Sequence, residues 1–249
     1  MFNLSAANSP VIGFYFKKIY ASKPNTLAHF LDTYSKGLGR QLSFIQIGGN
    51  DGFTNDPVHK FIKRDGWKGV ILEPLPDIFE SKLQRLYAKD QEVHTVNAAL
   101  GAEKGVANIY RIGFSNKRWA TGLTSFNRSV LEKAFTSGLV AKNLKKEGRT
   151  DVPDPKEGIV SQEIAVTTVN ELTDHYDLKA LDLLQVDTEG FDYEVIRMFM
   201  AAGSKPRVIV YEHIHLSQDH QERCKDLLGS NGYELTPFGA NTVANRKGA

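Results

Sequence analysis

The sequence predicts an α/β protein with a mostly parallel sheet and an antiparallel hairpin at its C-terminal end. Short apolar segments typical of buried strands alternate with segments of helical periodicity, as in successive βα units. Polar residues and glycines gather where the strands end. The chain closes with NGYEL and NTVAN, two short β-like segments joined by PFGA, which predict the hairpin at a sheet edge.

The first βα unit begins at residues 42–47, a short apolar segment typical of a strand buried on both faces. The loop GGNDG follows at residues 48–52. Asp56 then has the position of a helix cap, Pro57 suits the first turn, and Gly66 ends the helix.

Later segments continue the alternation. We expect further strands at residues 70–72, 93–98, 164–167, 181–186 and 207–211, and helices that begin near Pro76, Val169, Tyr193 and Gln218. Residues 1–40, with a helix at 26–35, form an N-terminal helical extension, and residues 41–249 form the main domain. Residues 111–160 are predicted to be a lid-like insertion with one helical pattern near 130–144, because loops of this length in compact domains tend to be lids or binding loops.

The composition excludes some classes of function. The net charge is +2, with 31 basic and 29 acidic residues, which argues against a dedicated nucleic-acid binder. Lys142, Lys145, Lys146 and Arg149 lack interleaved aromatic residues and are interpreted as solvent-exposed.

The single cysteine, Cys224, forms no internal disulfide and indicates a reducing compartment. The N-terminal apolar segment is too short to span a bilayer and lacks the basic start of a signal peptide, so we predict a cytoplasmic protein without an integral membrane segment. Phe14, Tyr15 and Phe16 are expected to pack on the main domain, and a homodimer contact through this segment is left open.

The polar clusters share a position at the carboxyl ends of the predicted strands, where open parallel sheets bind ligands. They are Gly48 to Gly52, Glu73, Asn97, Asp187 to Asp192, and Glu212 with His213. Glu73 follows the glycine-rich loop by about twenty residues, the spacing of an acid that contacts ribose hydroxyls. The loop is GGxxG without GK[ST], and Asp51 adds negative charge, which favours a cationic ligand such as S-adenosylmethionine over a diphosphate.

The ordered set of motifs resembles the FkbM family of S-adenosylmethionine-dependent methyltransferases. The motifs are FIQIGGNDG at 44–52, GWKGVILEPLPDIFE from 66, VNAALG at 96–101, LLQVDTEGFDYEVI at 183–196, and the terminal GYEL and NTVAN. The resemblance runs from about Leu42 to Asn245, apart from the insertion. It implies a Rossmann-like class I methyltransferase fold, S-adenosylhomocysteine as the product, and methyl transfer to a hydroxyl of a small molecule or saccharide.

The resemblance also implies a set of cofactor contacts. It puts Gly48, Gly49, Asn50 and Gly52 beneath the methionine part, Glu73 on the ribose, and Pro74, Asn97 and Ala98 beside the adenine. Asp187 would face the methionine amino group or the acceptor. Gln46 stands where many methyltransferases have an acid, so the ammonium group would depend more on Asp51 or Asp187.

Methyl transfer to a hydroxyl needs a base, and the candidates are Asp187, Glu212 and His213, of which His213 has the best-placed ordinary pKa. A structural role for His213 is equally compatible with the sequence. A divalent cation held by Asp187, Glu189, Asp192, Glu212 and His213 is considered but not favoured, because strand-end carboxylates also serve cofactors and helix N-termini. The segment Trp119 to Gly122, preceded by Lys117 and Arg118, is a candidate to close over the acceptor and bind an anion.

Two alternatives remain open. A non-catalytic S-adenosylmethionine-binding module would have the same loop and strand-end residues. A nicotinamide-dependent oxidoreductase is less favoured, because the chain lacks GxGxxG. A nucleic-acid base methyltransferase typically has a Pro-Pro-aromatic motif where this chain has Asp-Thr-Glu-Gly.

Overall fold

The central sheet has seven strands in the order β3-β2-β1-β7-β8-β10-β9. The computed structural model describes residues 1–248. The strands are β1 (Ser43–Ile47), β2 (Lys68–Leu72), β3 (Val93–Val96), β7 (Leu183–Val186), β8 (Val208–Glu212), β9 (Tyr233–Phe238) and β10 (Asn241–Arg246). The neighbouring strands β3, β2, β1, β7 and β8 pair in parallel, whereas β10 runs antiparallel to both β8 and β9. The predicted Rossmann-like α/β fold, a mostly parallel sheet with a closing antiparallel hairpin at its edge, is confirmed.

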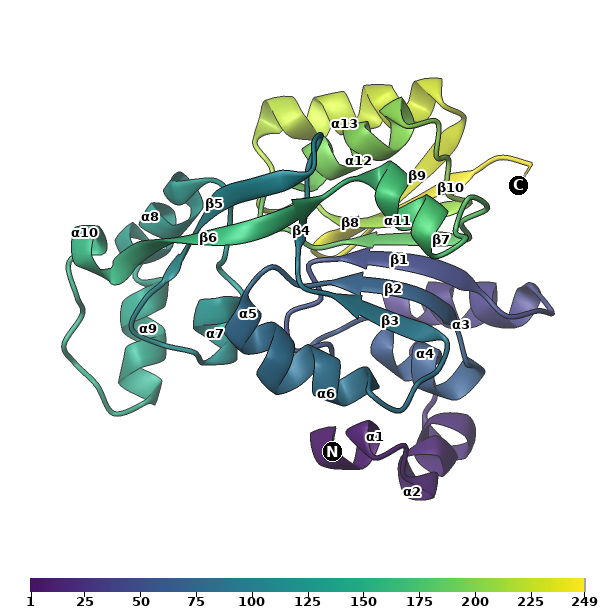
Figure 1. Ribbon diagram of the computed structural model, residues 1–249, viewed down its shortest axis with the longest axis horizontal. Coiled ribbons are helices and arrows are strands. Elements are labelled where there is room, and N and C mark those ends of the chain that lie inside the picture. The colour runs from purple at the N-terminus through teal and green to yellow at the C-terminus, as the bar shows by residue number, and fades with distance from the viewer. Residues whose placement is uncertain (249) are drawn as a thin grey trace.

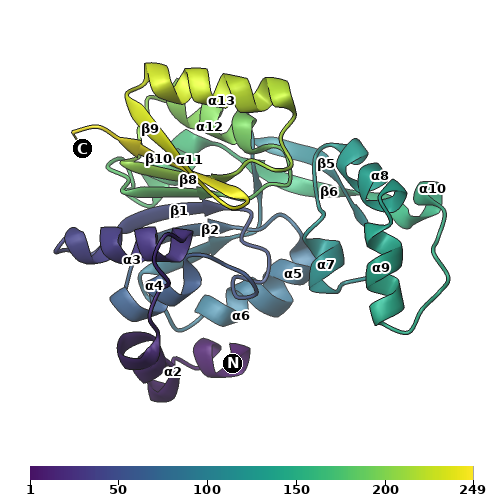
Figure 2. The ribbon, with the colours of Figure 1, turned by 180° about the vertical axis from the view of Figure 1, so that it is seen from behind.

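Helices cover both faces of this sheet (Figure 1, Figure 2). One face carries α11 (Val169–His175), α12 (Asp192–Ala201) and α13 (Gln218–Ser230), and the other carries α3 (Leu27–Gly37), α4 (His59–Asp65) and the run α5 (Pro76–Ile78), η2 (Phe79–Leu83) and α6 (Gln84–Tyr87). Successive strand residues point to opposite faces of the sheet. Ile45 therefore packs in the hydrophobic core beneath α11, α12 and α13, and Phe44 packs in the core beneath α3, α4 and α6. Both residues are fully buried, as the uninterrupted apolar sequence predicts.

The predicted cap and stop signals of α4 have the expected roles, but the helix begins at His59, so Pro57 precedes it and does not lie in its first turn. Asp56 accepts hydrogen bonds from the backbone N–H groups of Val58 and His59 through Oδ1, at 2.8 and 2.7 Å. Gly66 ends the helix with a left-handed φ of 65°. The helix predicted from Pro76 does begin there, but its middle turn, η2, is π-helical.

The insertion connects two strands of a second, three-stranded sheet, which projects from the main body (Figure 1). Strands β5 (Gly105–Ile112) and β6 (Ile159–Thr167) pair antiparallel, and β4 (Ala99–Leu100) pairs with β6. The strands expected at 93–98 and 164–167 were therefore wrong in extent: the first ends at Val96, and the second begins at Ile159 and lies outside the main sheet.

Four helices lie between β5 and β6: α7 (Arg118–Thr121), α8 (Arg128–Thr136), α9 (Leu139–Lys146) and α10 (Pro155–Gly158). The single helical pattern expected near 130–144 is two helices, because the chain turns at Gly138 with a left-handed φ of 77°. Leu131, Val140 and Leu144 are fully buried in a separate small core.

The N-terminal extension packs against α4 and α6. It contains α1 (Phe2–Ala6), α2 (Pro10–Phe14) and the π-helical η1 (Tyr15–Ile19). His59 anchors it, because Ser5 Oγ lies 2.9 Å from His59 Nε2 while Tyr87 Oη lies 2.8 Å from His59 Nδ1. Phe16 is buried as expected, but Phe14 is 59% exposed. Within residues 1–248, none of the helices has the length and apolar character needed to cross a membrane.

Candidate functional site

Two adjoining cavities open at the carboxyl ends of β1, β2, β7 and β8. The inner cavity is lined by residues that include Gly48, Asn50, Glu73, Pro74, Ala98, Phe126 and Phe191. The outer cavity, of about 500 Å³, is lined by residues that include Trp119, Gln185, Glu212, His215 and Asn241. Arg118, Gly122, Asp187 and Glu189 line both. The insertion and the central sheet therefore contribute jointly to each cavity.

The glycine-rich loop brings β1 close to the end of β7. Gly48 has a left-handed φ of 85°, and a Cβ added there would lie 1.8 Å from the backbone oxygen of Asp187. An added Cβ at Gly49 would lie 2.4 Å from Ile71, and one at Gly52 would lie 2.7 Å from Leu83. Gly48 thus shapes the inner cavity, whereas Gly49 and Gly52 allow the loop to pack on β2 and η2 and lie outside both linings.

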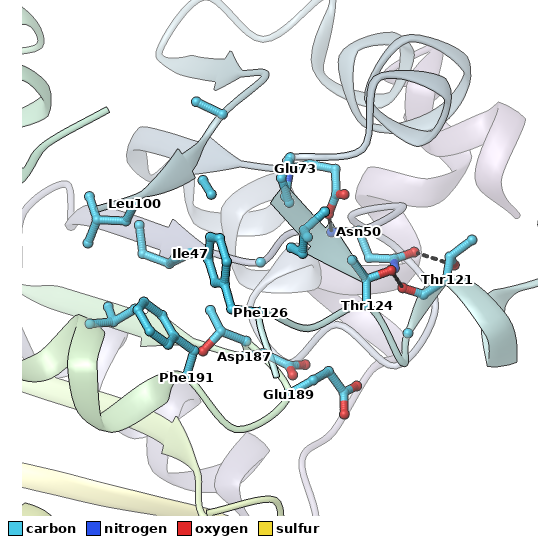
Figure 3. Close-up of a pocket in the computed structure, with 18 of the residues that line it drawn as sticks. Ile47, Asn50, Glu73, Leu100, Thr121, Thr124, Phe126, Asp187, Glu189 and Phe191 are labelled. Atoms are coloured by element: carbon cyan, nitrogen blue, oxygen red, sulfur yellow. Dashed lines mark hydrogen bonds between the residues drawn. The ribbon is translucent and has the colours of Figure 1, made fainter. Parts of the chain in front are cut away.

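Glu73 holds the loops that follow β1 and β2. Its carboxylate accepts hydrogen bonds from the backbone N–H groups of Asn50, at 2.7 Å, and Leu75, at 2.8 Å. Glu73 is only 4% exposed, and burial raises its pKa to about 7. Each carboxylate oxygen can accept more than one hydrogen bond, so Glu73 retains acceptor capacity toward the inner cavity (Figure 3).

Besides Gly49 and Gly52, three more of the predicted cofactor-binding residues lie outside the linings of both cavities. Gln46 donates from Nε2 to Asp56 Oδ2, and Asp51 Oδ1 accepts from two backbone N–H groups further along its own loop. Asn97 Nδ2 donates to the carbonyl oxygens of Glu73 and Pro74. The structure therefore gives Gln46, Asp51 and Asn97 roles in holding the loops.

Aromatic and aliphatic side chains form the apolar part of the inner cavity. The rings of Phe126 and Phe191 lie together with centroids 4.8 Å apart, and Figure 3 shows them apart from Glu73 and Asn50. Leu100 and Ile109 complete this part of the lining. The cavity thus has an apolar portion suited to a flat ring and a polar portion around Glu73.

The insertion contacts the glycine-rich loop directly. Thr121 Oγ1 donates to Asn50 Oδ1 at 3.2 Å, as Figure 3 shows. Ser125 Oγ donates to the backbone oxygen of Glu189 at 2.8 Å. These two contacts fix residues 118–126 over the junction of the cavities.

Acidic side chains gather at the ends of β7 and β8. Burial, followed by repulsion from neighbouring acids, raises the pKa of Glu189 to about 9 and that of Glu212 to about 8, and burial raises the pKa of Asp187. The positive charge of Arg118 opposes all three shifts. Asp192 is fully buried, accepts from Thr188 and from the backbone N–H of Glu212, and so joins the two strand ends.

The histidine at the outer cavity is His215. Its Nε2 lies 3.2 Å from Glu189 Oε2 and 3.6 Å from Glu212 Oε2. His213 Nδ1 instead lies 3.0 Å from Thr242 Oγ1 on β10, outside both linings. The expectation that His213 faces the cleft is therefore wrong, because the chain turns after Glu212 and directs the second histidine of this segment to the acids.

Comparison with known protein families shows to which family the chain belongs. Residues 46–235 match the family described as "Methyltransferase FkbM domain", which covers more than half of the sequence. The chain belongs to the FkbM methyltransferase family. No curated protein matches it.

Solved structures similar to this FkbM methyltransferase domain share little sequence with it. The S-adenosylhomocysteine-bound methyltransferase PaMTH1 of Podospora anserina is 9% identical, with a TM-score of 0.44 over 98% of this chain and 88% of that chain. The methyltransferase FkbM of Methylobacillus flagellatus KT is 11% identical, with a TM-score of 0.48 over 94% of this chain and 58% of that chain. The O-methyltransferase TomG of Streptomyces achromogenes is 14% identical, with a TM-score of 0.42 over 98% and 90%.

Sequence reasoning missed several residues that line the cavities of this FkbM domain. Phe126 lies in a segment without a distinctive pattern. Gln185 and Phe191 lie within the motif at 183–196, but neither residue type distinguishes a cavity lining from a place in the core. For His215 the only signal was the presence of a second histidine shortly after Glu212.

Proposed function

We propose that this protein is an S-adenosylmethionine-dependent O-methyltransferase that binds its cofactor in the inner cavity and its acceptor in the outer cavity. The observation that carries the proposal is the junction of the two cavities at Asp187, Glu189 and Arg118. A methyl donor in one cavity and an acceptor in the other would meet there. Such alignment is the main requirement, because the sulfonium methyl group is already activated.

The inner cavity suits the parts of S-adenosylmethionine. Phe126, Phe191 and Leu100 offer apolar surface to the adenine, and Glu73 offers acceptor oxygens to the ribose hydroxyls. Asp187 adds negative charge on the side of the outer cavity, where the ammonium and sulfonium groups would lie. This acidic lining disfavours a diphosphate and therefore disfavours the nicotinamide alternative.

The reaction needs one proton acceptor. A lone pair of the acceptor oxygen forms the new C–O bond, the electrons of the S–C bond pass to sulfur to give S-adenosylhomocysteine, and the hydroxyl proton passes to a carboxylate. Asp187 is our candidate base because its side chain lines both cavities, whereas Glu212 lines the outer cavity alone.

The outer cavity favours a polar acceptor with several hydroxyl groups, such as a saccharide. Gln185 and Asn241 offer amide groups, Glu212 offers a carboxylate, and Trp119 offers an aromatic face. A volume of about 500 Å³ lies within the ordinary range for small-molecule sites. This cavity, adjoining the inner one, also favours catalysis over a non-catalytic binding module.

Two expectations about the protein's surroundings complete the proposal. Its near-neutral balance of charge and its single cysteine favour a cytoplasmic enzyme that acts on small molecules and not on nucleic acid. A homodimer contact through the exposed Phe14 remains a prediction, which sedimentation velocity would test.

The test is methyl transfer from labelled S-adenosylmethionine to a panel of saccharides and other polyhydroxylated compounds. For Asp187→Asn we expect turnover to fall by at least about 100-fold, because a positioned base contributes about 10²–10⁴-fold. Affinity for S-adenosylhomocysteine should change far less. Asp226→Asn, at an exposed position on α13, is the matched control and should retain wild-type turnover. Full turnover in Asp187→Asn would exclude Asp187 as the base, and cofactor binding without any methylated product would favour the non-catalytic module.

A further inference from the structure

We propose that Glu189, Glu212 and His215 bind a divalent metal ion in the outer cavity. One ligand atom from each of these residues lies within 4.8 Å of the other two. All three residues line the outer cavity, at the point where the acceptor is proposed to bind. From the sequence alone a metal was not favoured, because strand-end carboxylates also serve cofactors and helix N-termini, and the histidine considered there was His213.

The spacing of the ligand atoms fits a small octahedral cation. Metal–ligand bonds of about 2.1 Å place neighbouring ligands about 3.0 Å apart and opposite ligands about 4.2 Å apart. His215 Nε2 lies 3.2 Å from Glu189 Oε2 and 3.6 Å from Glu212 Oε2. Both distances lie between the two octahedral values, so a cation could be bound with small side-chain adjustments.

Gln185 provides an independent observation. Its side chain lines the outer cavity and the residue is only 1% exposed, yet Oε1 accepts no hydrogen bond from the described residues 1–248. Its Nε2 donates to the backbone oxygen of Val186, which leaves the amide oxygen free. A buried, unpartnered amide oxygen is costly, and a hydrated cation in the same cavity would satisfy it.

Apart from their contacts with His215 Nε2, the two carboxylates also have unsatisfied oxygens. Glu189 Oε2 and Glu212 Oε2 are buried, and within the described part of the chain neither accepts a hydrogen bond. Both oxygens are therefore available as metal ligands.

The ligand types indicate the class of metal. Two carboxylates with one imidazole and open positions for water suit Mg²⁺ or Mn²⁺ better than a thiophilic ion. Bound here, the cation would coordinate an acceptor hydroxyl beside Asp187 and lower its pKa. This catalytic role rests on the proposed function, whereas metal binding itself does not.

The experiment measures Mn²⁺ binding to the protein by calorimetry and by electron paramagnetic resonance, without cofactor or acceptor. We expect one tight site in the wild-type protein, with Mg²⁺ as a competitor. Glu189→Gln, Glu212→Gln and His215→Ala should each weaken Mn²⁺ binding by at least about tenfold, since even residues behind the ligands change metal affinity about 10–100-fold. The control Glu171→Gln removes an acid that pairs with exposed Lys104 and should bind Mn²⁺ as the wild type does.

The outcomes separate this inference from the proposed function. Titration of Glu212→Gln and His215→Ala with S-adenosylhomocysteine should give wild-type affinity, because these two ligands line the outer cavity and not the inner one. Absence of Mn²⁺ binding in the wild type, or equal binding in all variants, overturns the metal site while leaving the methyltransferase proposal intact. Thermal melting identifies any variant that fails to fold. If a variant does not fold, nuclear magnetic resonance of the wild-type protein tests the site instead. Mn²⁺ bound there should broaden the proton resonances of His215 more than those of His220 on α13, and equal broadening of the two histidines would overturn the site.

Discussion

Gly48→Ala is the substitution whose cost follows most directly from the geometry. Gly48 has a left-handed φ of 85°, and an added Cβ would lie 1.8 Å from the backbone oxygen of Asp187. Ordinary contact begins at 3.4 Å, so the ends of β1 and β7 would have to separate by about 1.6 Å. That movement strains the hydrogen bond from the backbone N–H of Asp187 to the oxygen of Ile47, which is 3.0 Å long.

Two contributions set the size of the effect. A left-handed conformation costs a non-glycine residue about 1–2 kcal/mol. Overpacking costs about 1–3 kcal/mol more, and here the neighbour is backbone that cannot rotate away. We therefore expect the free energy of unfolding to fall by about 2–5 kcal/mol, which corresponds to a melting temperature lower by about 10 °C in a chain of this size.

Gly66→Ala is the matched control. Gly66 has a left-handed φ of 65°, but an added Cβ there would have no neighbour within 4 Å in the described structure. Only the conformational cost of about 1–2 kcal/mol then applies. Urea unfolding and titration with S-adenosylhomocysteine would be carried out on both variants. Gly48→Ala should be destabilised by about 1–3 kcal/mol more than Gly66→Ala, the cost of overpacking. Gly48→Ala should also lose cofactor affinity, while Gly66→Ala should keep it. Equal stability and equal affinity of the two variants would refute this account of the loop.

Three further predictions concern other parts of the molecule. Burial lowers the pKa of His59 from its ordinary value of 6.5 to about 3. At a pH between these two values the unfolded chain binds the proton and the folded chain does not, so lowering the pH from 7 to 5 should reduce the free energy of unfolding by about 2 kcal/mol. Urea unfolding of His59→Gln should lack this component, and an identical pH dependence in the two proteins would contradict it. Phe126→Ala should weaken S-adenosylhomocysteine binding by about tenfold in calorimetry, because a buried aromatic contact contributes about 1–3 kcal/mol, and unchanged affinity would place the adenine elsewhere. His213→Ala should retain methyl-transfer turnover while His215→Ala loses it, and the reverse result would restore His213 as the catalytic candidate.

Most of the main sheet could be predicted from the sequence because its signals are local. The apolar run at 42–47, the cap at Asp56 and the glycine at Gly66 each act within one element. The order of the strands in the sheet does not follow from these signals, because it depends on contacts between elements distant in the sequence. The second sheet was missed because β5 and β6 pair across the whole insertion, and residues so distant in sequence leave no periodic signal in either strand.

The candidate site was only partly predictable, since a position at a strand end does not determine where a side chain points. Glu73, Asp187 and Glu212 line the cavities as their placement suggested. Asn97 has the same kind of placement, yet its amide bonds to the backbone of the neighbouring loop. The turn after β8 brings His215, and not the expected His213, to the acids, and such a turn depends on packing that the sequence does not display.

The central claim is that the inner cavity binds S-adenosylmethionine or its product. Isothermal titration of the wild-type protein with S-adenosylhomocysteine, with NAD⁺ in a parallel titration, tests it most directly. We predict binding of one S-adenosylhomocysteine per chain and no binding of NAD⁺. Binding of NAD⁺ alone, or of neither compound, would contradict the claim and the assignment of Glu73 to the ribose.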